Sequence, residues 1–305
     1  DDALSRGLGD VYKRQEMRHL LDFQDVNKNH LENLIEKTRS LEVKLENLGS
    51  LALLKFDEPS TRTRLSFAIA AEKLGIKTFE SSDVVSAKQK GEILKHEIET
   101  YVSMGIEVLV LRTKENNIDD YREFNNISVI SAGFGNKSHP TQALIDISTL
   151  YSLNKINEKH TPVTYVGDVK HSRVFESGRE LLNILGFKVG VFTDKKLLPD
   201  NKNDLEIYES WDEVFESSNA IELLRVQKER LQDNEEINFD EYINNYQLTQ
   251  EILGKSQSDL AVLHPMPINI GIEISKDAIE DRKIKYKDQL SHAIPSRIAA
   301  FKYVR

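Results

Sequence analysis

Hydrophobic residues recur along this chain in short runs rich in Val, Ile and Leu, and these runs alternate with segments of helical period. The runs occupy residues 50–56, 107–113, 127–133, 162–168, 187–193, 220–226 and 259–265. Continuous apolar runs of this length are typical of strands that are buried on both faces of a parallel sheet. The pattern therefore predicts a buried parallel strand at each run.

Segments of helical period lie between these strands, and two of them carry clear boundary signals. Residues 65–75 end at Gly75, and residues 140–153 begin with Pro140, which suits the first turn of a helix. Residues 294–304 are apolar on one face and predict a last helix. Each of these segments is long enough to cover one face of a neighbouring sheet.

The alternation of strand and helix predicts an α/β fold. The runs supply more strands than one half-sheet needs, so we expect two doubly wound domains, each a parallel sheet flanked by helices. Their boundary is expected near the helix at residues 140–153. Residues 228–242 are acidic and rich in Asn, and predict a mobile loop. Residues 1–16 are expected to be a non-native or disordered tail, because they resemble translated adapter DNA and lack the apolar core of a signal peptide.

Composition narrows the class of protein. The chain has 305 residues, of which 39% are hydrophobic, enough for one large domain or two smaller ones. No apolar run approaches the roughly 20 residues that a membrane span needs. A net charge of -9 without a concentrated basic patch disfavours nucleic acid as a partner. The absence of Cys rules out disulfides, thiolate nucleophiles and Cys-ligated zinc, and fits a cytoplasmic location.

The segment FDEPSTRTRLSF, at residues 56–67, carries the strongest chemical signal. Ser60 is a suitable N-cap, and a helix N-terminus that follows a strand binds anions through its backbone N–H groups and its dipole. Thr61 and Thr63 add hydroxyl donors, and Arg62 adds a planar guanidinium that suits phosphate oxygens. The segment therefore predicts a phosphate site. The alternative, a capped surface helix with solvated arginines, fits so dense a cluster less well.

Further polar residues lie at or just after the carboxyl ends of other predicted strands, where ligands bind in open α/β sheets. They are Arg112, His139, Gln142, Arg173, Arg225, Gln227 and the HPMP segment at residues 264–267. Several cations at this edge of an acidic protein suggest a pair of small anionic substrates. The chain has neither GxxxxGK[ST] nor GxGxxG, which argues against a kinase, an NTPase and a dinucleotide-dependent dehydrogenase.

Six motifs, in this order and spacing, resemble the catalytic chain of the aspartate carbamoyltransferase family. They are FDEPSTRTRLSF, KGE, SHPTQALID, VGDVKHSRV, RVQKER and VLHPMP, and the resemblance runs from Met17 to the C-terminus. It implies transfer of the carbamoyl group of carbamoyl phosphate to L-aspartate, giving N-carbamoyl-L-aspartate and phosphate in pyrimidine biosynthesis. It also implies that the reaction uses no metal and no cofactor.

The resemblance also implies a role for each residue that matches a motif. Carbamoyl phosphate would be held by Ser60, Thr61, Arg62, Thr63, Arg112, His139, Gln142 and the backbone near Met266 and Pro267. Aspartate would be held by Lys90, Arg173, Arg225 and Gln227. The catalytic residues would be Arg62, Thr63, Lys90, Arg112 and His139, of which Thr63, Arg112 and His139 polarise the carbonyl group.

The same resemblance implies an organisation for the whole molecule. Residues 17–145 with 291–305 would form the carbamoyl-phosphate-binding domain, onto which the C-terminal helix packs back, and residues 146–290 the aspartate-binding domain. Ser86 and Lys90 would reach the active site of a neighbouring subunit, so a homotrimer with shared sites is expected. A regulatory chain or a dihydroorotase is a possible further partner.

Several positions depart from the family pattern. Met266 replaces a frequent Leu, Ile268 replaces the Arg of many members, and Val174 stands where some members have Thr. Ile270 stands where the unregulated trimeric branch has a polar or basic residue, which puts contacts of domain closure in doubt.

Two alternative functions remain open. An ornithine carbamoyltransferase, or an enzyme for another amino acid, shares the STRTR element. However, this chain has HPMP rather than HCLP, and its VSMG at residues 102–105 lies on the helix after KGE, where we expect it to pack rather than to bind ornithine. A non-catalytic homologue that acts as a binding module is the other alternative. Such a homologue usually loses the phosphate-site residues, which are all present here.

Overall fold

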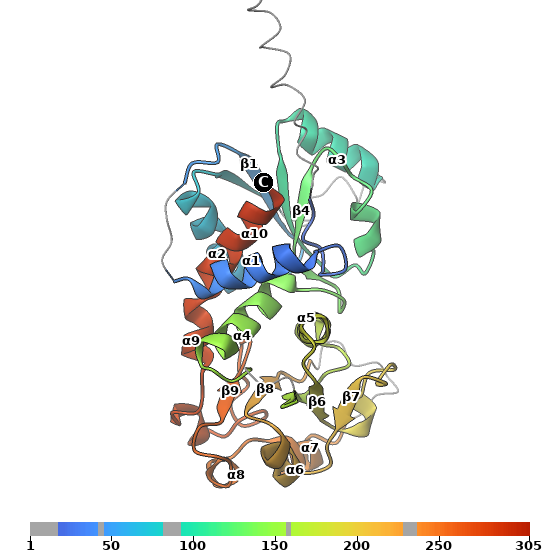
Figure 1. Cartoon of the computed structure of the whole chain (residues 1–305). Coiled ribbons are helices and arrows are strands. Elements are labelled where there is room, and N and C mark those ends of the chain that lie inside the picture. The colour runs from blue at the N-terminus through green and yellow to red at the C-terminus, as the bar shows by residue number, and fades with distance from the viewer. Residues whose placement is uncertain (1–17, 42–45, 82–92, 157–159, 228–236) are drawn as a thin grey trace, which may run out of the picture.

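The computed structural model describes residues 18–41, 46–81, 93–156, 160–227 and 237–305. Two parallel sheets lie in separate halves of the molecule, and helices α4 (Pro140–Ser152) and α5 (Arg173–Leu185) lie between them (Figure 1). The predicted α/β fold with two doubly wound domains is confirmed. The boundaries of these domains, residues 17–145 with 291–305 and residues 146–290, stay a prediction.

The first sheet has the strand order β2-β1-β3-β4. Its strands are β1 (Leu51–Phe56), β2 (Lys77–Ser81), β3 (Val108–Thr113) and β4 (Ser128–Phe134), and all of its pairs are parallel. The chain runs outward from β1 to β2 and then returns to β3 on the other side of β1. The order therefore reverses between β1 and β3, and such a reversal opens a crevice at the carboxyl ends of the two strands.

The second sheet has the order β7-β6-β5-β8-β9. It consists of β5 (Val163–Gly167), β6 (Val189–Phe192), β7 (Leu205–Ile207), β8 (Ala220–Leu224) and β9 (Ala261–Leu263), again all parallel. Here the order reverses between β5 and β8. The protein therefore has two such reversals, one in each sheet.

Every predicted strand is present, but two strands carry no apolar run. β2 and β7 lie at the edges of their sheets, and most of their side chains are exposed or half-buried. An edge strand is covered on fewer sides than a central one, so its sequence does not need to be continuously hydrophobic. This is why periodicity alone missed both strands.

Helix boundaries follow local signals. α2 (Thr61–Lys73) begins four residues before the predicted helix at 65–75, immediately after the FDEPS segment. It ends before Gly75, whose φ of +63° lies in the left-handed region that favours glycine. α4 begins at Pro140, as predicted. The other helices are α1 (Lys28–Arg39), α3 (Leu94–Ser103), α6 (Trp211–Ser217), α7 (Phe239–Tyr246), α8 (Gln250–Gly254) and α9 (Tyr286–Ser291), with short 3₁₀ turns at Ile118–Tyr121, Lys195–Leu197 and Ala278–Glu280.

Two expectations need correction. The predicted loop at 228–242 is wrong at its end, because α7 begins at Phe239; Asn238 caps that helix by accepting from the N–H groups of Asp240 and Glu241. Residues 228–236 lie outside the described part of the chain. The VSMG segment packs only in part, because Val102 contacts the core whereas the side chain of Met104 is 70% exposed.

The C-terminal helix α10 (Ala293–Val304) packs back on the first half of the molecule (Figure 1). The ring of Phe301 meets that of Phe67 edge to face with centroids 5.8 Å apart. At the C-terminal end of the helix, Ser128 Oγ donates to the carbonyl of Val304 over 3.0 Å. The predicted return of this helix is confirmed.

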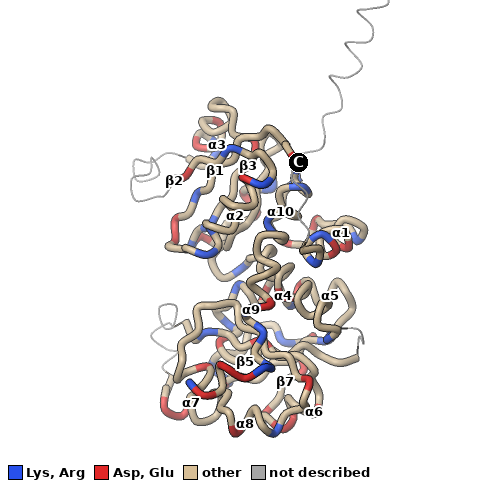
Figure 2. The backbone as a smooth tube through the Cα atoms, turned by 90° about the vertical axis from the view of Figure 1, so that its left-hand side faces the viewer, with Lys and Arg blue, Asp and Glu red and all other residues tan. Residues whose placement is uncertain are grey.

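Lys, Arg, Asp and Glu positions are spread over both halves of the molecule (Figure 2). Within the described ranges, no helix has the length and apolar character that crossing a membrane requires. No group of three or more His, Asp or Glu side chains among those residues is placed to hold a metal ion.

Candidate active site

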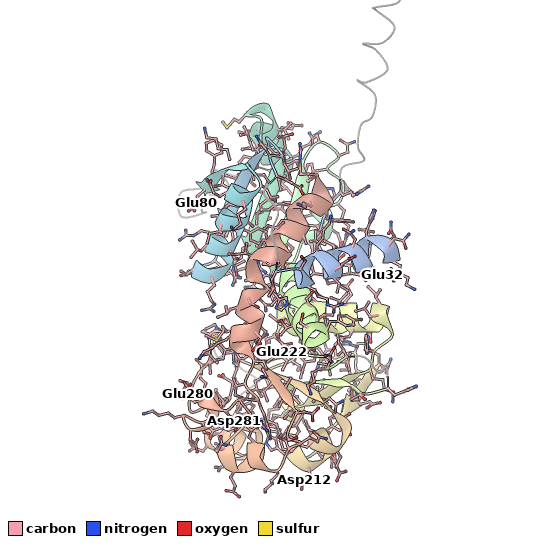
Figure 3. All side chains as sticks on the ribbon, turned by 60° about the vertical axis from the view of Figure 1, so that its left-hand side comes forward. Glu32, Glu80, Asp212, Glu222, Glu280 and Asp281 are labelled. Carbon is pink, nitrogen blue, oxygen red and sulfur yellow. The ribbon has the colours of Figure 1, made fainter. Side chains whose placement is uncertain are left out.

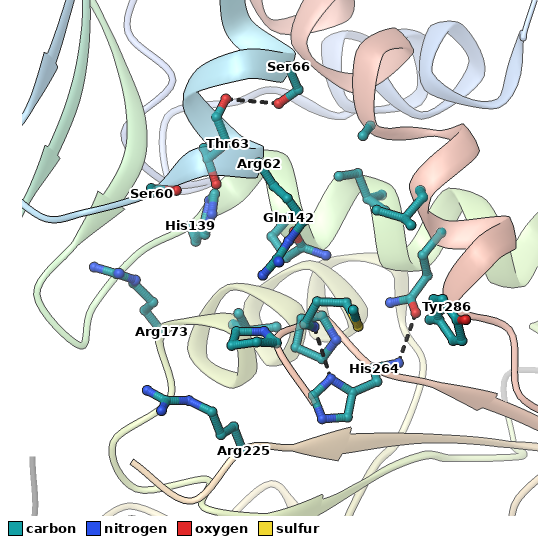
Figure 4. Close-up of a pocket in the computed structure, with 18 of the residues that line it drawn as sticks. Ser60, Arg62, Thr63, Ser66, His139, Gln142, Arg173, Arg225, His264 and Tyr286 are labelled. Carbon is teal, nitrogen blue, oxygen red and sulfur yellow. Dashed lines mark hydrogen bonds between the residues drawn. The ribbon is translucent and has the colours of Figure 1, made fainter. Parts of the chain in front are cut away.

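A pocket of about 370 Å³ lies between the two sheets, where both strand-order reversals open (Figure 4). Every candidate residue that the structure describes lines it: Ser60, Thr61, Arg62, Thr63, Arg112, His139, Gln142, Arg173, Arg225, Gln227, Met266 and Pro267. Ser86 and Lys90 lie outside the described residues. Residues separated by up to about two-thirds of the chain thus converge because the carboxyl edges of both sheets face one another.

The N-terminus of α2 forms one wall of the pocket. Ser60 occupies the N-cap position in an extended conformation, with φ of -158°, but its side chain makes no capping hydrogen bond to the described residues of α2. Ser60 therefore occupies the expected N-cap position, but the expectation that its side chain caps the helix is wrong. The first turn of α2 also contains no acidic residue. This leaves the N-terminal N–H groups and the Ser60 hydroxyl to an anion.

Glu58 links two of the arginines that line the pocket. One oxygen of its buried carboxylate lies 3.3 Å from Arg112 Nε and 2.7 Å from an Arg173 terminal nitrogen. Arg112 lies near the end of β3 in the first half, whereas Arg173 opens α5 in the second, so the carboxylate joins the two halves. Sequence reasoning missed Glu58, although an acidic residue beside several cations in the FDEPSTRTR segment was a usable signal.

His139 is a buried imidazole at the start of α4. Its backbone N–H donates to Ser177 Oγ over 2.8 Å. Burial, and then the positive charges of Arg297, Arg112 and Arg173, lower the pKa of His139 well below its usual range. The ring is therefore neutral at physiological pH and can donate one N–H without carrying a charge. Its Nδ1 has no hydrogen-bond partner among the described residues.

Gln142 and the loop after β9 form the floor of the pocket. Gln142 Nε2 donates to Asp146 Oδ1 over 2.8 Å. The loop turns sharply at Met266, whose φ is +62°, and the following peptide bond to Pro267 is cis. His264 Nδ1 accepts from the Met266 N–H over 2.9 Å, which holds the turn (Figure 4). Gln142 and this loop thereby face the same part of the pocket.

The wall contributed by the second sheet is organised around Asp168, directly after β5. Its two oxygens accept from His171 Nδ1, over 2.9 Å, and from the Gln227 backbone N–H, over 3.1 Å. The Gln227 side chain donates in turn to the His171 carbonyl over 2.8 Å. These bonds tie the loop after β8 to the loop after β5 and place Arg225 beside Arg173 (Figure 4). Asp168 and His171, in VGDVKH, were not singled out from the sequence.

Arg297, on α10, also lines the pocket and was missed. It is buried, and one terminal nitrogen donates to the Thr141 carbonyl over 3.2 Å. Burial lowers its pKa to about 10, a change that the carboxylate of Asp146 opposes, so the side chain stays charged at neutral pH. Arg297 lies in no motif that the sequence analysis recognised. It reaches the pocket only because α10 packs back on the first half of the molecule.

Among the departures from the family pattern, Val174 and Met266 line the pocket, whereas Ile270 is 54% exposed. Ile268 is half-buried and packs against the core of the second half. The roles assigned to these four positions stay predictions.

Two family models of carbamoyltransferase domains match the sequence of this chain, one over each half of the molecule. The model described as "Aspartate/ornithine carbamoyltransferase, carbamoyl-P binding domain" matches residues 18–152. The model described as "Aspartate/ornithine carbamoyltransferase, Asp/Orn binding domain" matches residues 159–304. The chain belongs to the aspartate/ornithine carbamoyltransferase family, and the resemblance found in the sequence is confirmed.

Curated relatives carry the more particular name "Aspartate carbamoyltransferase catalytic subunit". The protein of that name from Aquifex aeolicus is 33% identical over 294 residues, which cover 94% of this chain and 99% of that one. The protein of that name from Thermus thermophilus is 32% identical over 293 residues, which cover 93% of this chain and 96% of that one.

Solved structures agree on the fold. Aspartate transcarbamoylase from Trypanosoma cruzi, in complex with carbamoyl phosphate and aspartate, superposes with a TM-score of 0.82 at 23% identity, over 94% of this chain and 96% of that one. The catalytic subunit of aspartate transcarbamoylase from M. jannaschii superposes with a TM-score of 0.78 at 27% identity, over 94% of this chain and 98% of that one. Ornithine carbamoyltransferase from Pyrococcus furiosus superposes with a TM-score of 0.79 at 21% identity, over 94% of this chain and 96% of that one. Because both kinds of enzyme fit equally well, the fold does not select the second substrate.

Proposed function

We propose that this carbamoyltransferase transfers the carbamoyl group of carbamoyl phosphate to L-aspartate, giving N-carbamoyl-L-aspartate and phosphate. One observation carries the proposal. An anion-binding helix terminus in the first half faces a pair of arginines, Arg173 and Arg225, from the second half across one pocket (Figure 4). Two sets of cationic groups suit a phosphate on one substrate and two carboxylates on the other.

The phosphate of carbamoyl phosphate would lie at the N-terminus of α2. Ser60, Thr61, Arg62 and Thr63 supply hydroxyls, backbone N–H groups and a guanidinium on one turn of the chain. Arg112, at the end of the neighbouring β3, would bridge the phosphate and the carbonyl oxygen. The uncommitted Ser60 hydroxyl and the absence of acidic residues from the first turn of α2 support this placement.

The reaction would proceed by direct attack of the aspartate amine on the carbonyl carbon. As the C–N bond forms, negative charge develops on the carbonyl oxygen, where Thr63, Arg112 and neutral His139 would stabilise it. The C–O bond to phosphate then breaks, and the departing phosphate takes the proton that the nitrogen releases. Gln142 and the backbone at Met266 and Pro267 would hold the carbamoyl amino group throughout. Holding both substrates converts a bimolecular attack into a positioned one.

The carboxylates of aspartate would lie against Arg173, Arg225 and Gln227. Guanidinium groups bind carboxylates through paired hydrogen bonds, whereas they repel the cationic side chain of ornithine. The names of the curated relatives support the same choice. Ornithine carbamoyltransferase is the second candidate, favoured by the equal fit of the Pyrococcus furiosus structure. A non-catalytic binding module is disfavoured, because the described candidate residues line one pocket.

We further propose that the active unit is a cytoplasmic homotrimer with shared sites that serves pyrimidine synthesis. Ser86 and Lys90 would enter the pocket of the neighbouring subunit, and Lys90 would contact aspartate. Mixing Arg62→Ala and Lys90→Ala chains tests this arrangement, since a hybrid trimer retains one intact shared site. Hybrids as inactive as the two parents would contradict it.

Product formation tests the substrate assignment. The protein is incubated with carbamoyl phosphate and either L-aspartate or L-ornithine, and both products are quantified. We expect carbamoyl aspartate and no citrulline. Citrulline alone would overturn the aspartate site and leave the phosphate site standing, and neither product from folded protein would favour the binding module.

A further inference from the structure

Behind Gln142, two acidic side chains that the reaction does not use are buried against each other. Asp146 lies on α4 and Glu222 on β8, and each is 1% exposed. Figure 3 shows Glu222 in the interior below α4, whereas Glu32, Glu80 and Asp212 project from the outside of the molecule. Buried carboxyl groups are costly unless they are paired or protonated, so this pair needs a physical explanation.

One oxygen of Asp146 holds two glutamine side chains. Asp146 Oδ1 accepts from Gln142 Nε2 over 2.8 Å and from Gln289 Nε2 over 2.9 Å. A side-chain amide that donates through its nitrogen turns its oxygen the other way. The Gln289 oxygen accordingly accepts from the His264 N–H over 2.8 Å, in the loop after β9. The Gln142 oxygen is likewise left to face the pocket, where an acceptor suits the amino group of a carbamoyl ligand.

The other oxygens of the pair lack a donor. Asp146 Oδ2 and both Glu222 carboxyl oxygens meet no hydrogen-bond donor among the described residues, although the two carboxyl groups are in contact. Two ionised carboxylates only accept, so they would repel each other there. A proton on Glu222 converts the contact into an O–H···O hydrogen bond to Asp146. Asp146 then stays ionised and keeps both of its glutamine donors.

The surrounding charges fit a pair that carries a single negative charge. Burial raises the pKa of Asp146 to about 7, while burial and the adjacent Asp146 raise the pKa of Glu222 well above its usual range. Arg297, on α10, supplies a positive charge that attracts the carboxylate of Asp146. Tyr165, on β5, faces the same pair, and burial with the two carboxyl groups raises its pKa well above its usual range. These charges fit a cluster of one carboxylate, one carboxylic acid and one guanidinium.

We propose that Asp146 and Glu222 share one proton and act together as the positioning unit that points the Gln142 carbonyl oxygen into the pocket, towards the amino group of the carbamoyl ligand. This inference rests on the proposed function, which assigns that amino group to Gln142. Asp146 does not touch the substrate; it acts through Gln142. Asp146 also holds Gln289, whose oxygen accepts from the His264 N–H, so one carboxylate positions both parts of the pocket floor, Gln142 and the loop after β9.

Isosteric amides test the shared proton. In Asp146→Asn, the new amide nitrogen donates to Glu222, which ionises in place of Asp146. In Glu222→Gln, the new amide donates to an ionised Asp146. Each single variant keeps one negative charge opposite Arg297 and keeps the Gln142 oxygen facing the pocket. The double variant Asp146→Asn/Glu222→Gln has no negative charge opposite Arg297, and its two neutral amides hold the side chain of Gln142 less strongly than a pair that carries a charge.

The readout is calorimetric binding at pH 8 of phosphonoacetamide, a stable phosphonate with a terminal amide, compared with inorganic phosphate, which has no amide. We expect each single variant to keep the wild-type preference for phosphonoacetamide within about threefold, and the double variant to lose about tenfold or more, as a lost hydrogen bond to a charged group implies. Phosphate affinity is expected to change less than about twofold in all three, because that site does not involve Gln142.

Each contrary outcome rejects a different part of the proposal. If the double variant prefers phosphonoacetamide as strongly as the single variants do, the shared negative charge does not position Gln142. If the single variants lose this preference as far as the double variant does, Asp146 and Glu222 do not share a proton. Equal loss of phosphate and phosphonoacetamide affinity indicates general damage and overturns the positioning role. A wild type without preference for phosphonoacetamide, or without product, is instead a failure of the proposed function.

A second variant keeps the proposal testable if the double variant does not fold. Glu222→Leu preserves volume but removes the proton that Asp146 accepts, so protonation of Asp146 begins at higher pH than in Glu222→Gln. Arg297 and Tyr165 are present in both variants, so their effects cancel. We expect the preference for phosphonoacetamide to fall between pH 9 and pH 7 by at least about threefold more in Glu222→Leu than in Glu222→Gln. Equal pH profiles would overturn the role of Glu222.

Discussion

Helices α2 and α5 both point their N-termini at the pocket, and each carries an arginine there, but the two ends are built differently. In α5, Ser172 caps the helix by accepting from the Phe175 N–H over 3.2 Å, and Glu176 adds a negative charge to the first turn. In α2, Ser60 makes no such bond to the described residues of its helix, and the first turn contains no acidic residue. One end is satisfied by the protein itself, and the other is left for a ligand.

This difference gives the pocket two distinct anion sites, one at each helix end. The end of α2 attracts an anion through its backbone and dipole, whereas the end of α5 serves to place the side chain of Arg173. Glu58 ties the two ends together, since its carboxylate contacts Arg173 over 2.7 Å and Arg112 over 3.3 Å. A phosphate is therefore expected at α2 and a carboxylate at α5.

The largest effect is expected where the ligand-binding end of α2 loses its charge. Arg62→Ala should lower kcat/KM by about 10²–10³-fold, the usual loss when one group that stabilises transition-state charge is removed. Inorganic phosphate should also bind more weakly, as measured by calorimetry. Arg282→Ala is the matched control, because Arg282 is exposed and donates only over 3.4 Å to the Ser258 carbonyl. An Arg62→Ala enzyme as active as this control would remove the basis for placing phosphate at α2.

A smaller and more selective effect is expected at α5. Arg173→Leu should raise the KM for aspartate by about 10–100-fold, as the loss of charged hydrogen bonds to a carboxylate implies, with little change in the affinity for phosphate. The control is Arg179→Leu on the same helix, where Arg179 pairs instead with Asp204. Steady-state kinetics with each substrate varied separately give both constants. If phosphate affinity fell as far as aspartate affinity, the two helix ends would not have separate roles.

The sequence predicts the α2 end well because its information is local. A strand, a hydroxyl-rich turn and a helix follow one another within residues 50–75, so spacing alone places the groups. Arg297 could not be found in this way, because only the packing of α10 against the first half brings it to the pocket. Asp146 and Glu222 also escape sequence reasoning, since their contact joins α4 to β8 across 76 residues of chain. Edge strands β2 and β7 were missed because exposure relaxes the need for an apolar run.

Replacing each of the two N-cap serines by alanine tests the comparison of the two helix ends most directly. Ser172→Ala removes a helix cap and should lower the free energy of unfolding by about 1 kcal/mol. Ser60→Ala removes no capping bond and should change that free energy by less than about 0.5 kcal/mol, while weakening phosphate binding by about tenfold. Denaturant unfolding and calorimetry measure the two effects. Two variants with the same loss of stability would mean that Ser60 caps α2 after all.

The smallest effect concerns the buried pair behind the pocket, and its sign depends on pH. Below about pH 4.5, Glu222 is protonated in both the folded and the unfolded chain, so the group does not alter stability. As pH rises, the unfolded chain releases this proton while the folded protein retains it, because burial first, and then Asp146, raises the pKa of Glu222. Folding stability is therefore lost progressively above pH 4.5.

Glu222→Gln removes this titration and keeps the hydrogen bond to Asp146. Its melting temperature should equal that of the wild type near pH 4.5 and exceed it by a few degrees at pH 8, since 1 kcal/mol corresponds to about 2–4 °C in domains of about 150–250 residues. The control is Glu280→Gln, at an exposed position where no such trend is expected. The buried histidines are common to all three proteins, so their own pH dependence cancels. A difference between Glu222→Gln and wild type that stays constant from pH 4.5 to pH 8 would show that Glu222 does not retain its proton on folding, and the single negative charge opposite Arg297 would then lose its support.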